Sequence, residues 1–380
     1  MEVNGYLPIN TRVLSSASST KIEPDILTEI YEHAEKLKLD KNRVFELKES
    51  NQSDQLYKEI FIRICNMLGD IMPHVFEKIT DYTELLLPDN LLAIGSVIRD
   101  LVTTVDEDDF KEEVEIIGWM YQFYISEKKD EVLSKPKGQK YTKEEIPAVT
   151  QLFTPKWIVK YMTENSLGRL WQESHPNDDL KKSWEYYIEP APQEEEVQNK
   201  LEALKNPNLS PEDIKVIDPA MGSGHILVYA FDVLYDIYLS RGYVERDIPR
   251  LIIEKNLYGL DIDDRAAQLA IFALMMKARS KNKWFFRHKI NHNLCAIQES
   301  NDISNDTVRI FSDGNQKGIK YLIKTFIAAK EYGSILKVEP INFEALKNEG
   351  DRQIETNDSD DKKKSLSKLF SRLHYSELKP

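Results

Sequence analysis

The chain has 380 residues, 41% of them hydrophobic and 30% charged, which is enough for two or three domains with buried cores and excludes a wholly disordered chain. Its net charge of −13 argues against a surface that coats DNA in general, although a DNA enzyme with local basic elements stays compatible with it. No apolar run approaches the roughly 18 residues that a membrane span needs, so we expect no membrane partner.

The start of the chain and its cysteines bear on its compartment. The first residues, Met-Glu-Val-Asn-Gly, lack the basic and apolar regions of a signal peptide. Cys65 and Cys295 lie far apart, in no spacing typical of a zinc site. We therefore expect a cytoplasmic protein in a reducing environment, without a metal site.

Residues 1–130 predict a helical N-terminal region. After a loop over 1–20, apolar residues recur at helical spacing from Glu23, over 56–68, over 91–101 and over 114–127. The last of these stretches carries Met120, Tyr121 and Tyr124, which we interpret as core packing. No constellation of chemically reactive side chains is predicted within this region.

Residues 131–171 predict an exposed connector followed by a helix. Thr154 is expected to cap that helix with Pro155 at its first position. Ile158, Val159 and Met162 are expected on its inward face. Residues 172–213, with several prolines and the acidic run Glu194–Glu196, predict a surface insertion that carries a short helix.

Residues 214–345 predict an α/β unit. Strands and helices alternate along it, with a strand over 214–218, a glycine turn, an apolar helix over 225–241, a strand over 256–263, a helix over 264–281 and a third strand over 293–300. This alternation is typical of a parallel sheet. The polar stretch over 346–380 predicts a tail without a core pattern.

The first strand ends at Asp218 and the second at Asp261. Gly222 and Gly224 follow the first strand, where they let the backbone turn and let a ligand approach closely. A carboxylate at the end of the second strand can accept both hydroxyls of a ribose. The spacing of 43 residues between the two acids exceeds the roughly 20 of a dinucleotide unit, and the sequence contains no P-loop. These patterns disfavour a dehydrogenase or a nucleoside triphosphatase.

Three motifs resemble those of N6-adenine DNA methyltransferases. Asp218-Pro-Ala-Met-Gly-Ser-Gly-His resembles their S-adenosylmethionine-binding motif, and Leu257-Tyr-Gly-Leu-Asp-Ile-Asp resembles their ribose-binding motif. Phe153-Thr-Pro-Lys-Trp-Ile-Val resembles the motif that closes over the methionine end of the cofactor. The resemblance implies a Rossmann-like methyltransferase sheet with S-adenosyl-L-methionine as cofactor. It also implies these cofactor-binding residues: Phe153, Thr154, Pro155, Asp218, Pro219, Ala220, Gly222, Ser223, Gly224, His225, Asp261 and Ile262.

Further phrases resemble the PglX family, the large adenine-specific methyltransferases of the BREX phage-defence system. They are Met1-Glu-Val-Asn-Gly-Tyr-Leu-Pro, Tyr229-Ala-Phe-Asp-Val-Leu-Tyr, Arg265-Ala-Ala-Gln-Leu-Ala and Lys330-Glu-Tyr-Gly-Ser-Ile-Leu-Lys. In that family the first phrase is internal and a long region follows the last. We therefore expect a chain truncated at both ends, with an incomplete sheet whose unpaired edge lowers solubility.

One departure from the family concerns catalysis. Such enzymes use an N-P-P-Y motif, whose side-chain and backbone oxygens accept the amino hydrogens of a flipped adenine. This sequence contains no Pro-Pro pair, and its Asn206-Pro207 pair precedes the cofactor motif. The sequence therefore predicts no catalytic residue, and we expect the chain to be inactive alone.

Three alternatives stay open. The chain could be a regulatory S-adenosylmethionine-binding module, it could be one subunit of a split enzyme, or it could methylate RNA or a small molecule. The expected partners are double-stranded DNA, reached through a full-length enzyme, and a second polypeptide or other defence-system subunits.

Overall fold

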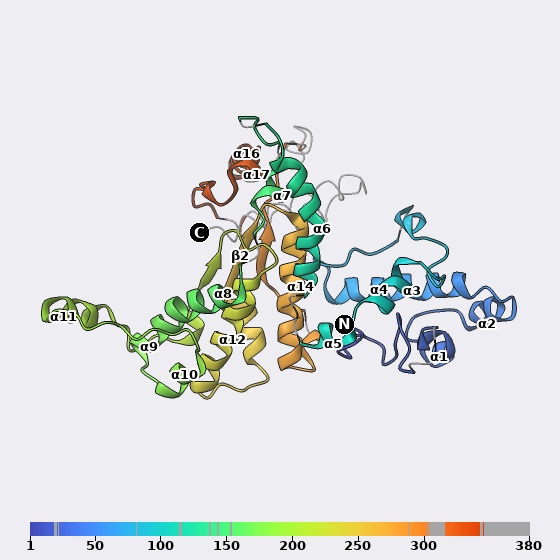
Figure 1. The fold of residues 1–380 in the computed structure, drawn as a ribbon, viewed down its shortest axis with the longest axis horizontal. Coiled ribbons are helices and arrows are strands. Elements are labelled where there is room, and N and C mark those ends of the chain that lie inside the picture. Colours follow the sequence, from blue (N-terminus) through green and yellow to red (C-terminus); the bar gives the residue numbers. More distant parts are fainter. Residues whose placement is uncertain are drawn as a thin grey trace. The chain divides into compact units, whose positions relative to one another are not determined.

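The computed structural model describes residues 1–345 except 19, 20, 22, 81, 113, 115, 137, 143, 153, 288, 302, 304–315, 343 and 344. It divides into two compact units, which are described separately (Figure 1). Unit 1 contains residues 1–117 and 275–289, and unit 2 contains residues 118–274 together with those from 290 onward. The predicted polar tail over 346–380 lies outside the described residues.

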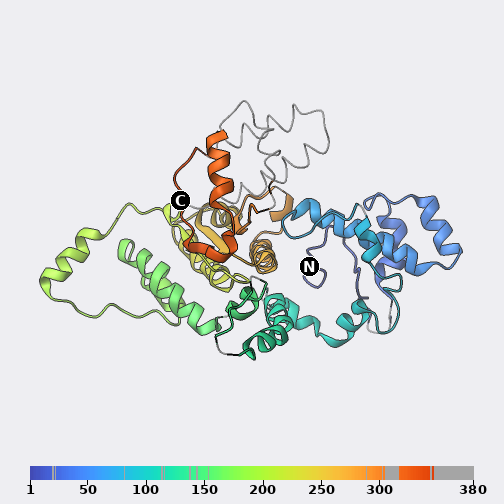
Figure 2. The ribbon, with the colours of Figure 1, turned by 90° about the horizontal axis from the view of Figure 1, so that it is seen from above.

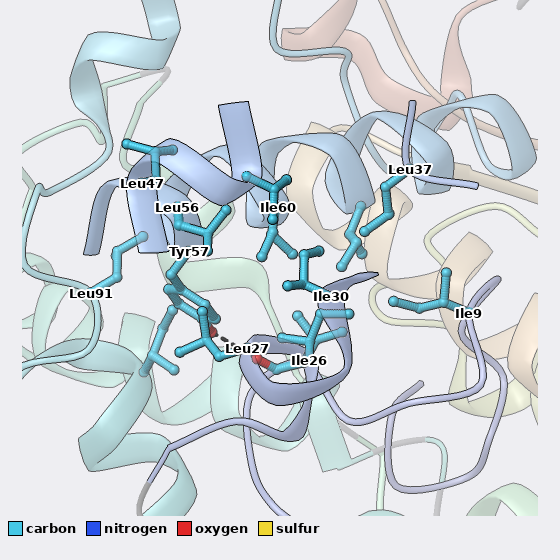
Figure 3. Packing of buried hydrophobic residues seen from close by; sticks show 14 of the residues in the cluster. Ile9, Ile26, Leu27, Ile30, Leu37, Leu47, Leu56, Tyr57, Ile60 and Leu91 are labelled. Atoms are coloured by element: carbon cyan, nitrogen blue, oxygen red, sulfur yellow. Dashed lines mark hydrogen bonds between the residues drawn. The ribbon is translucent and has the colours of Figure 1, made fainter. Parts of the chain in front are cut away.

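Unit 1 is helical, as its apolar periodicity predicted. Its elements are α1 (Asp25–His33), α2 (Lys41–Glu49), α3 (Ser53–Ile71), η1 (Tyr82–Leu86), α4 (Val97–Thr104), α5 (Glu107–Glu112) and η5 (Phe285–Arg287). Figure 3 shows apolar side chains of α1, α2 and α3 packed together around Ile26, Ile30 and Ile60, which are fully buried. Close packing of this kind is the main favourable contribution to the stability of such a unit.

The loop over 1–18 contributes to the same core. Ile9 and Val13 are buried in it, and the Tyr57 hydroxyl donates to the Val13 carbonyl at 2.9 Å. The Glu2 carboxylate accepts the backbone N–H groups of Val13 and Leu14, both at 2.7 Å. A carboxylate in a concave run of N–H groups replaces the hydrogen bonds that secondary structure would make, which explains how a segment without helical pattern is held in place.

Unit 2 contains a parallel sheet in the order β1-β2-β3, within the residues that the structure describes. The strands are β1 (Val216–Asp218), β2 (Leu257–Asp261) and β3 (Asn293–Ala296), each inside a predicted range. Asp218 pairs with Gly259, and Asp261 pairs with Ala296. The carboxyl ends of the strands therefore meet at one edge, where ligands of open α/β sheets bind.

The crossovers between the strands are helical. They are formed by α12 (His225–Ser240), α13 (Ile248–Leu251), η4 (Ile252–Asn256) and α14 (Asp264–Lys281), and the segment before β1 ends in η3 (Pro211–Asp213). Asn256, which is fully buried, donates to the carbonyls of Pro211 and Ile214 at 2.7 and 2.8 Å and accepts from the Tyr238 hydroxyl at 2.9 Å. One satisfied amide thus fixes the entry points of two neighbouring strands.

The remaining helices of unit 2 are α6 (Ile116–Leu133), which begins two residues before the unit, α7 (Ile146–Thr150), α8 (Lys156–Thr163), η2 (Glu164–Gly168), α9 (Arg169–Ser174), α10 (Asp178–Ser183), α11 (Glu195–Leu204), α16 (Gln316–Thr325), α17 (Ala329–Tyr332) and η6 (Gly333–Ile335). None of the helices among the described residues is long and apolar enough to cross a membrane. Between α16 and α17, Ala328 adopts a left-handed backbone, with φ of 52°.

Two local predictions for α8 were wrong. Pro155, not Thr154, occupies the N-cap position, and no side-chain hydrogen bond caps the helix. Val159 is buried as predicted, but Met162 is 47% exposed. The reason is that the buried face of α8 runs through Val159 and Thr163, four residues apart, so Met162 lies beside that face and not on it.

The predicted surface insertion is a mixture of exposed and packed segments. No residue of α11 is buried, so the acidic run that begins it is solvated, and Figure 2 shows α11 between two long connections. Trp171 and Trp184, by contrast, are 1% and 4% exposed. A Cβ at Gly168 would lie 2.9 Å from the Trp184 ring, so the part of the insertion around Trp184 packs tightly against η2.

Candidate functional site

The turn between β1 and α12 has the backbone that its glycines predicted. Gly222 and Gly224 have φ of 53° and 88°, in the left-handed region that side chains disfavour. Gly224 also approaches α14, because a Cβ there would lie 2.9 Å from the Cβ of Ala270. The Met221 N–H donates to the Leu260 carbonyl of β2 at 2.9 Å, which ties the turn to the neighbouring strand.

The side chain of Met221 explains why β2 has a glycine at position 259. That side chain is 4% exposed and packs over β2, where a Cβ at Gly259 would collide with the sulfur. The flexible thioether therefore fills the space that the absent side chain of Gly259 leaves in the sheet.

The acid at the end of β2 is held against the turn. The Gly222 N–H donates to Asp261 Oδ2 at 2.8 Å, and the Asp263 N–H donates to Asp261 Oδ1 at 2.8 Å. At the end of β1, Asp218 Oδ1 accepts the Ala220 N–H at 3.1 Å. The structure thus brings Asp218 and Asp261, which lie 43 residues apart in sequence, together with the glycine turn.

Burial shifts the pKa values of these two acids. It raises the pKa of Asp218 above its usual value of 3.8, and the charge of Asp261 adds to the effect. Burial also raises the pKa of Asp261, against the opposing effect of the N–H groups that donate to it. Two desolvated carboxyls at one edge favour a ligand that carries positive charge, because such a ligand stabilises their ionised forms.

The aromatic face of α6 is not core packing, so that interpretation was wrong. Tyr124 is 71% exposed and Met120 is 42% exposed. Tyr121 donates its hydroxyl to Asp263 Oδ2 at 2.7 Å, and burial together with this carboxylate raises the Tyr121 pKa. Of these side chains, Tyr121 therefore contacts the segment that follows β2.

The backbone of α6 lies directly against the glycine turn. A Cβ at Gly118 would lie 2.6 Å from Ser223 Oγ and 2.9 Å from Ser223 Cβ. The neighbouring Trp119 ring meets the His225 ring edge-on, with centroids 6.2 Å apart. Residues 1–130 therefore contribute to the site, contrary to the prediction. The signal in the sequence was Gly118 itself, because a glycine inside a helical pattern costs about 1 kcal/mol and usually has a packing reason.

Ser223 has an unusual environment. The residue is 4% exposed, and within the described part of the chain its hydroxyl has no hydrogen-bond partner. A buried hydroxyl without a partner costs about 1–3 kcal/mol, so it indicates a group that arrives with a ligand. Its position between two left-handed glycines, over the N-terminus of α12, suits an anionic or polar ligand group.

The other predicted site residues are placed as follows. Pro219 and Ala220 are exposed on the outer side of the turn, and Ile262 is partly buried beside Gly333. Thr154 is partly buried and Pro155 is exposed, at the start of the helix that packs on α12. Phe153 lies outside the described residues.

Taken together, the fold and the site define an α/β protein that presents a glycine turn and two acids at the carboxyl edge of a parallel sheet. Comparison with protein families agrees with this class. Residues 193–311 match the family model described as MmeI, DNA-methyltransferase domain.

The curated relatives are more specific. The chain is 44% identical over 373 residues to the adenine-specific methyltransferase BrxX of Escherichia coli O9:H4 (strain HS), and 39% identical over 368 residues to the adenine-specific methyltransferase PglX of Lacticaseibacillus casei (strain Zhang). These alignments cover 91% and 90% of this chain and 30% of each relative. The chain is therefore similar to these adenine-specific methyltransferases and spans about 30% of their length, which confirms the resemblance predicted from its motifs.

Proposed function

We propose that the chain is the cofactor-binding part of an adenine-specific DNA methyltransferase, with S-adenosyl-L-methionine as its cofactor. The observation that carries the proposal is the hydrogen bond of 2.8 Å from Gly222 N–H to Asp261. It joins the glycine turn and the acid at the end of β2 into one site, next to the Ser223 hydroxyl, which has no hydrogen-bond partner among the described residues.

The residues fit this cofactor chemically. S-adenosylmethionine carries an ammonium and a sulfonium, and the two desolvated carboxyls of Asp218 and Asp261 favour positive charge. Asp261 can accept ribose hydroxyls, and Ser223 together with the N–H groups of the turn can bind the carboxylate of the methionine part. When bound, the cofactor supplies a methyl group on positively charged sulfur, and the role of this chain is to orient that group and to shield it from water.

We further propose that transfer of the methyl group to adenine N6 requires residues outside this sequence. The amino nitrogen of adenine is a weak nucleophile because its lone pair is delocalised into the ring, so acceptors for its hydrogens are needed. The sequence has no N-P-P-Y motif to supply them. The full-length enzyme would bind double-stranded DNA and act in phage defence, alone or with other defence-system subunits.

Calorimetry tests the cofactor assignment. The chain should bind S-adenosylmethionine with measurable heat and should not bind NAD. Asp261→Ala should weaken S-adenosylmethionine binding about tenfold or more, because a hydrogen-bonding carboxylate is lost from the site. Tight binding of NAD, or no binding of S-adenosylmethionine, would refute the assignment.

A second assay tests the division of labour. Incubation of the chain with duplex DNA and methyl-labelled S-adenosylmethionine should give no labelled adenine, although the cofactor is bound. Multiple turnover by the chain alone would show that it carries its own acceptor site for the base.

A further inference from the structure

A cavity of about 700 Å³ opens beside the acid at the end of β2. It is lined by Asp263 and Arg265 and by residues in or next to α6 and α7, which are Tyr121, Tyr124, Ile125, Glu127, Lys128, Glu131, Glu144, Pro147, Ala148 and Gln151. Its volume lies within the roughly 300–1,000 Å³ range of small-molecule pockets. The cavity belongs entirely to unit 2, so its shape depends on one packed body.

One polar group in this wall lacks a partner. The side-chain amide of Gln151 is shielded from solvent, and in the described residues neither its nitrogen nor its oxygen makes a hydrogen bond. The backbone of Gln151 is fixed, since its N–H donates to the Pro147 carbonyl at 3.1 Å and its carbonyl accepts from Lys129 Nζ at 3.2 Å. A buried amide carries a desolvation cost that a ligand with one donor and one acceptor would remove.

An aromatic pair lies in the same cavity. The rings of Tyr121 and Tyr124 are stacked, with centroids 6.3 Å apart and an interplanar angle of 21°. Tyr121 is anchored by its hydrogen bond to Asp263, whereas Tyr124 is 71% exposed. An exposed tyrosine alone needs no explanation. Here its ring is held by an anchored neighbour at the wall of a cavity, which leaves a surface on which a flat ring can stack.

We propose that this cavity binds the adenine base of the cofactor, with Tyr124 as the stacking residue and Gln151 as the residue that reads the edge of the base. A glutamine amide can pair with adenine through one donated and one accepted hydrogen bond, to the ring nitrogen and from the amino group. The location suits the cofactor because Asp263, which lines the cavity, donates its N–H to Asp261 at 2.8 Å. The inference rests on the proposed function, which supplies the adenosine.

The test is calorimetry with S-adenosylhomocysteine, a stable product that keeps the adenosine part, and with methylthioadenosine, which lacks the amino-acid part. Tyr124→Ala should weaken binding of both ligands roughly 5- to 100-fold, the range for loss of one stacked base, whereas Tyr124→Phe should stay within about threefold of the unmodified chain. The matched control is Phe123→Ala, since Phe123 lies next to Tyr124 on α6, is 74% exposed and does not line the cavity. It should leave both affinities unchanged.

Gln151→Leu separates a ligand role from a structural one. Removal of a buried amide without a partner should leave the melting temperature of the free chain unchanged or higher, because an apolar side chain pays no desolvation cost there. The same variant should weaken binding of both ligands about tenfold. A variant that melts lower and binds normally would show that Gln151 serves the fold.

The outcomes distinguish the two proposals. If the unmodified chain binds neither S-adenosylmethionine nor its product, the proposed function fails. If it binds them and the Tyr124 and Gln151 variants bind equally well, the proposed function stands and the adenine site is refuted. If these variants lose affinity for an adenine-containing oligonucleotide and keep it for both cofactor-derived ligands, the cavity receives a base of the nucleic acid and the inference is likewise overturned.

Discussion

Gly118→Ala tests whether α6 shapes the glycine turn. The new methyl group would lie 2.6 Å from Ser223 Oγ and 3.5 Å from His225 Nε2, so Ser223 must move. Overpacking of this kind costs about 1–3 kcal/mol, and the higher helix propensity of alanine returns about 1 kcal/mol. We therefore expect a net destabilisation of about 0–2 kcal/mol, or a melting temperature lower by up to about 8 °C.

Cofactor binding should respond more strongly than stability. A displaced Ser223 hydroxyl loses the ligand hydrogen bond proposed for it, which should weaken binding about tenfold in calorimetry. Gly69→Ala is the control. Gly69 lies in α3, within unit 1, and a methyl group there would lie 3.0 Å from the Phe76 carbonyl oxygen. The control should lower stability and leave affinity unchanged.

A double variant adds a direct test of contact. Ser223→Gly removes the two Ser223 atoms that lie closest to the new methyl group, so Gly118→Ala should destabilise the chain less in that background, with a coupling of about 0.5–3 kcal/mol. A Gly118→Ala chain that keeps both its melting temperature and its affinity, or a coupling of zero, would show that α6 does not press on the turn.

Three further predictions concern the same site. Tyr121→Phe removes the hydrogen bond of 2.7 Å to Asp263 and should lower stability by about 1.5–3 kcal/mol, measured by urea denaturation; an unchanged midpoint would mean that the bond is not formed in solution. Burial raises the pKa of Asp218 and Asp261 above 3.8. The free chain therefore loses stability as the pH rises from 3.8 through the raised pKa values, because the buried carboxyls ionise. A cationic cofactor favours the ionised forms. Affinity for S-adenosylmethionine should therefore increase with pH over that window in calorimetry, and a fall over it would contradict the assignment. Gly259→Ala should lower the melting temperature markedly, since its methyl group collides with the methionine of the turn, and a variant as stable as the unmodified chain would refute this packing.

The parallel α/β unit was predictable because its signals are local. Each strand is a short apolar run, and Asp218 and Asp261 follow the first two of them. The glycine turn was predictable for the same reason, since a left-handed backbone at Gly222 and Gly224 restricts the choice of residue at those positions alone. The motif resemblance then predicted the similarity to adenine-specific methyltransferases, which the comparisons confirm.

Predictions failed where a side chain's environment depends on a distant segment. The Thr154 cap was wrong because the helix begins one residue later, at Lys156, with Pro155 as its N-cap. Met162 was placed wrongly because the buried face of α8 runs through Val159 and Thr163, so Met162 lies beside that face. Periodicity reports which residues share a face, but it carries no information on where the neighbouring element ends.

By itself, the sequence determined the order of strands and helices, the glycine turn, the two acids and the relationship to the adenine-specific methyltransferases. Only the tertiary structure decided that α6 lies against that turn, with Gly118 on Ser223 and Tyr121 on Asp263. The physical reason is range: backbone conformation and periodicity are set by residues a few positions apart, whereas Tyr121 and Asp263 are separated by 142 positions. Whether an aromatic residue enters a core or lines a site is fixed by packing between such segments, which no local pattern encodes.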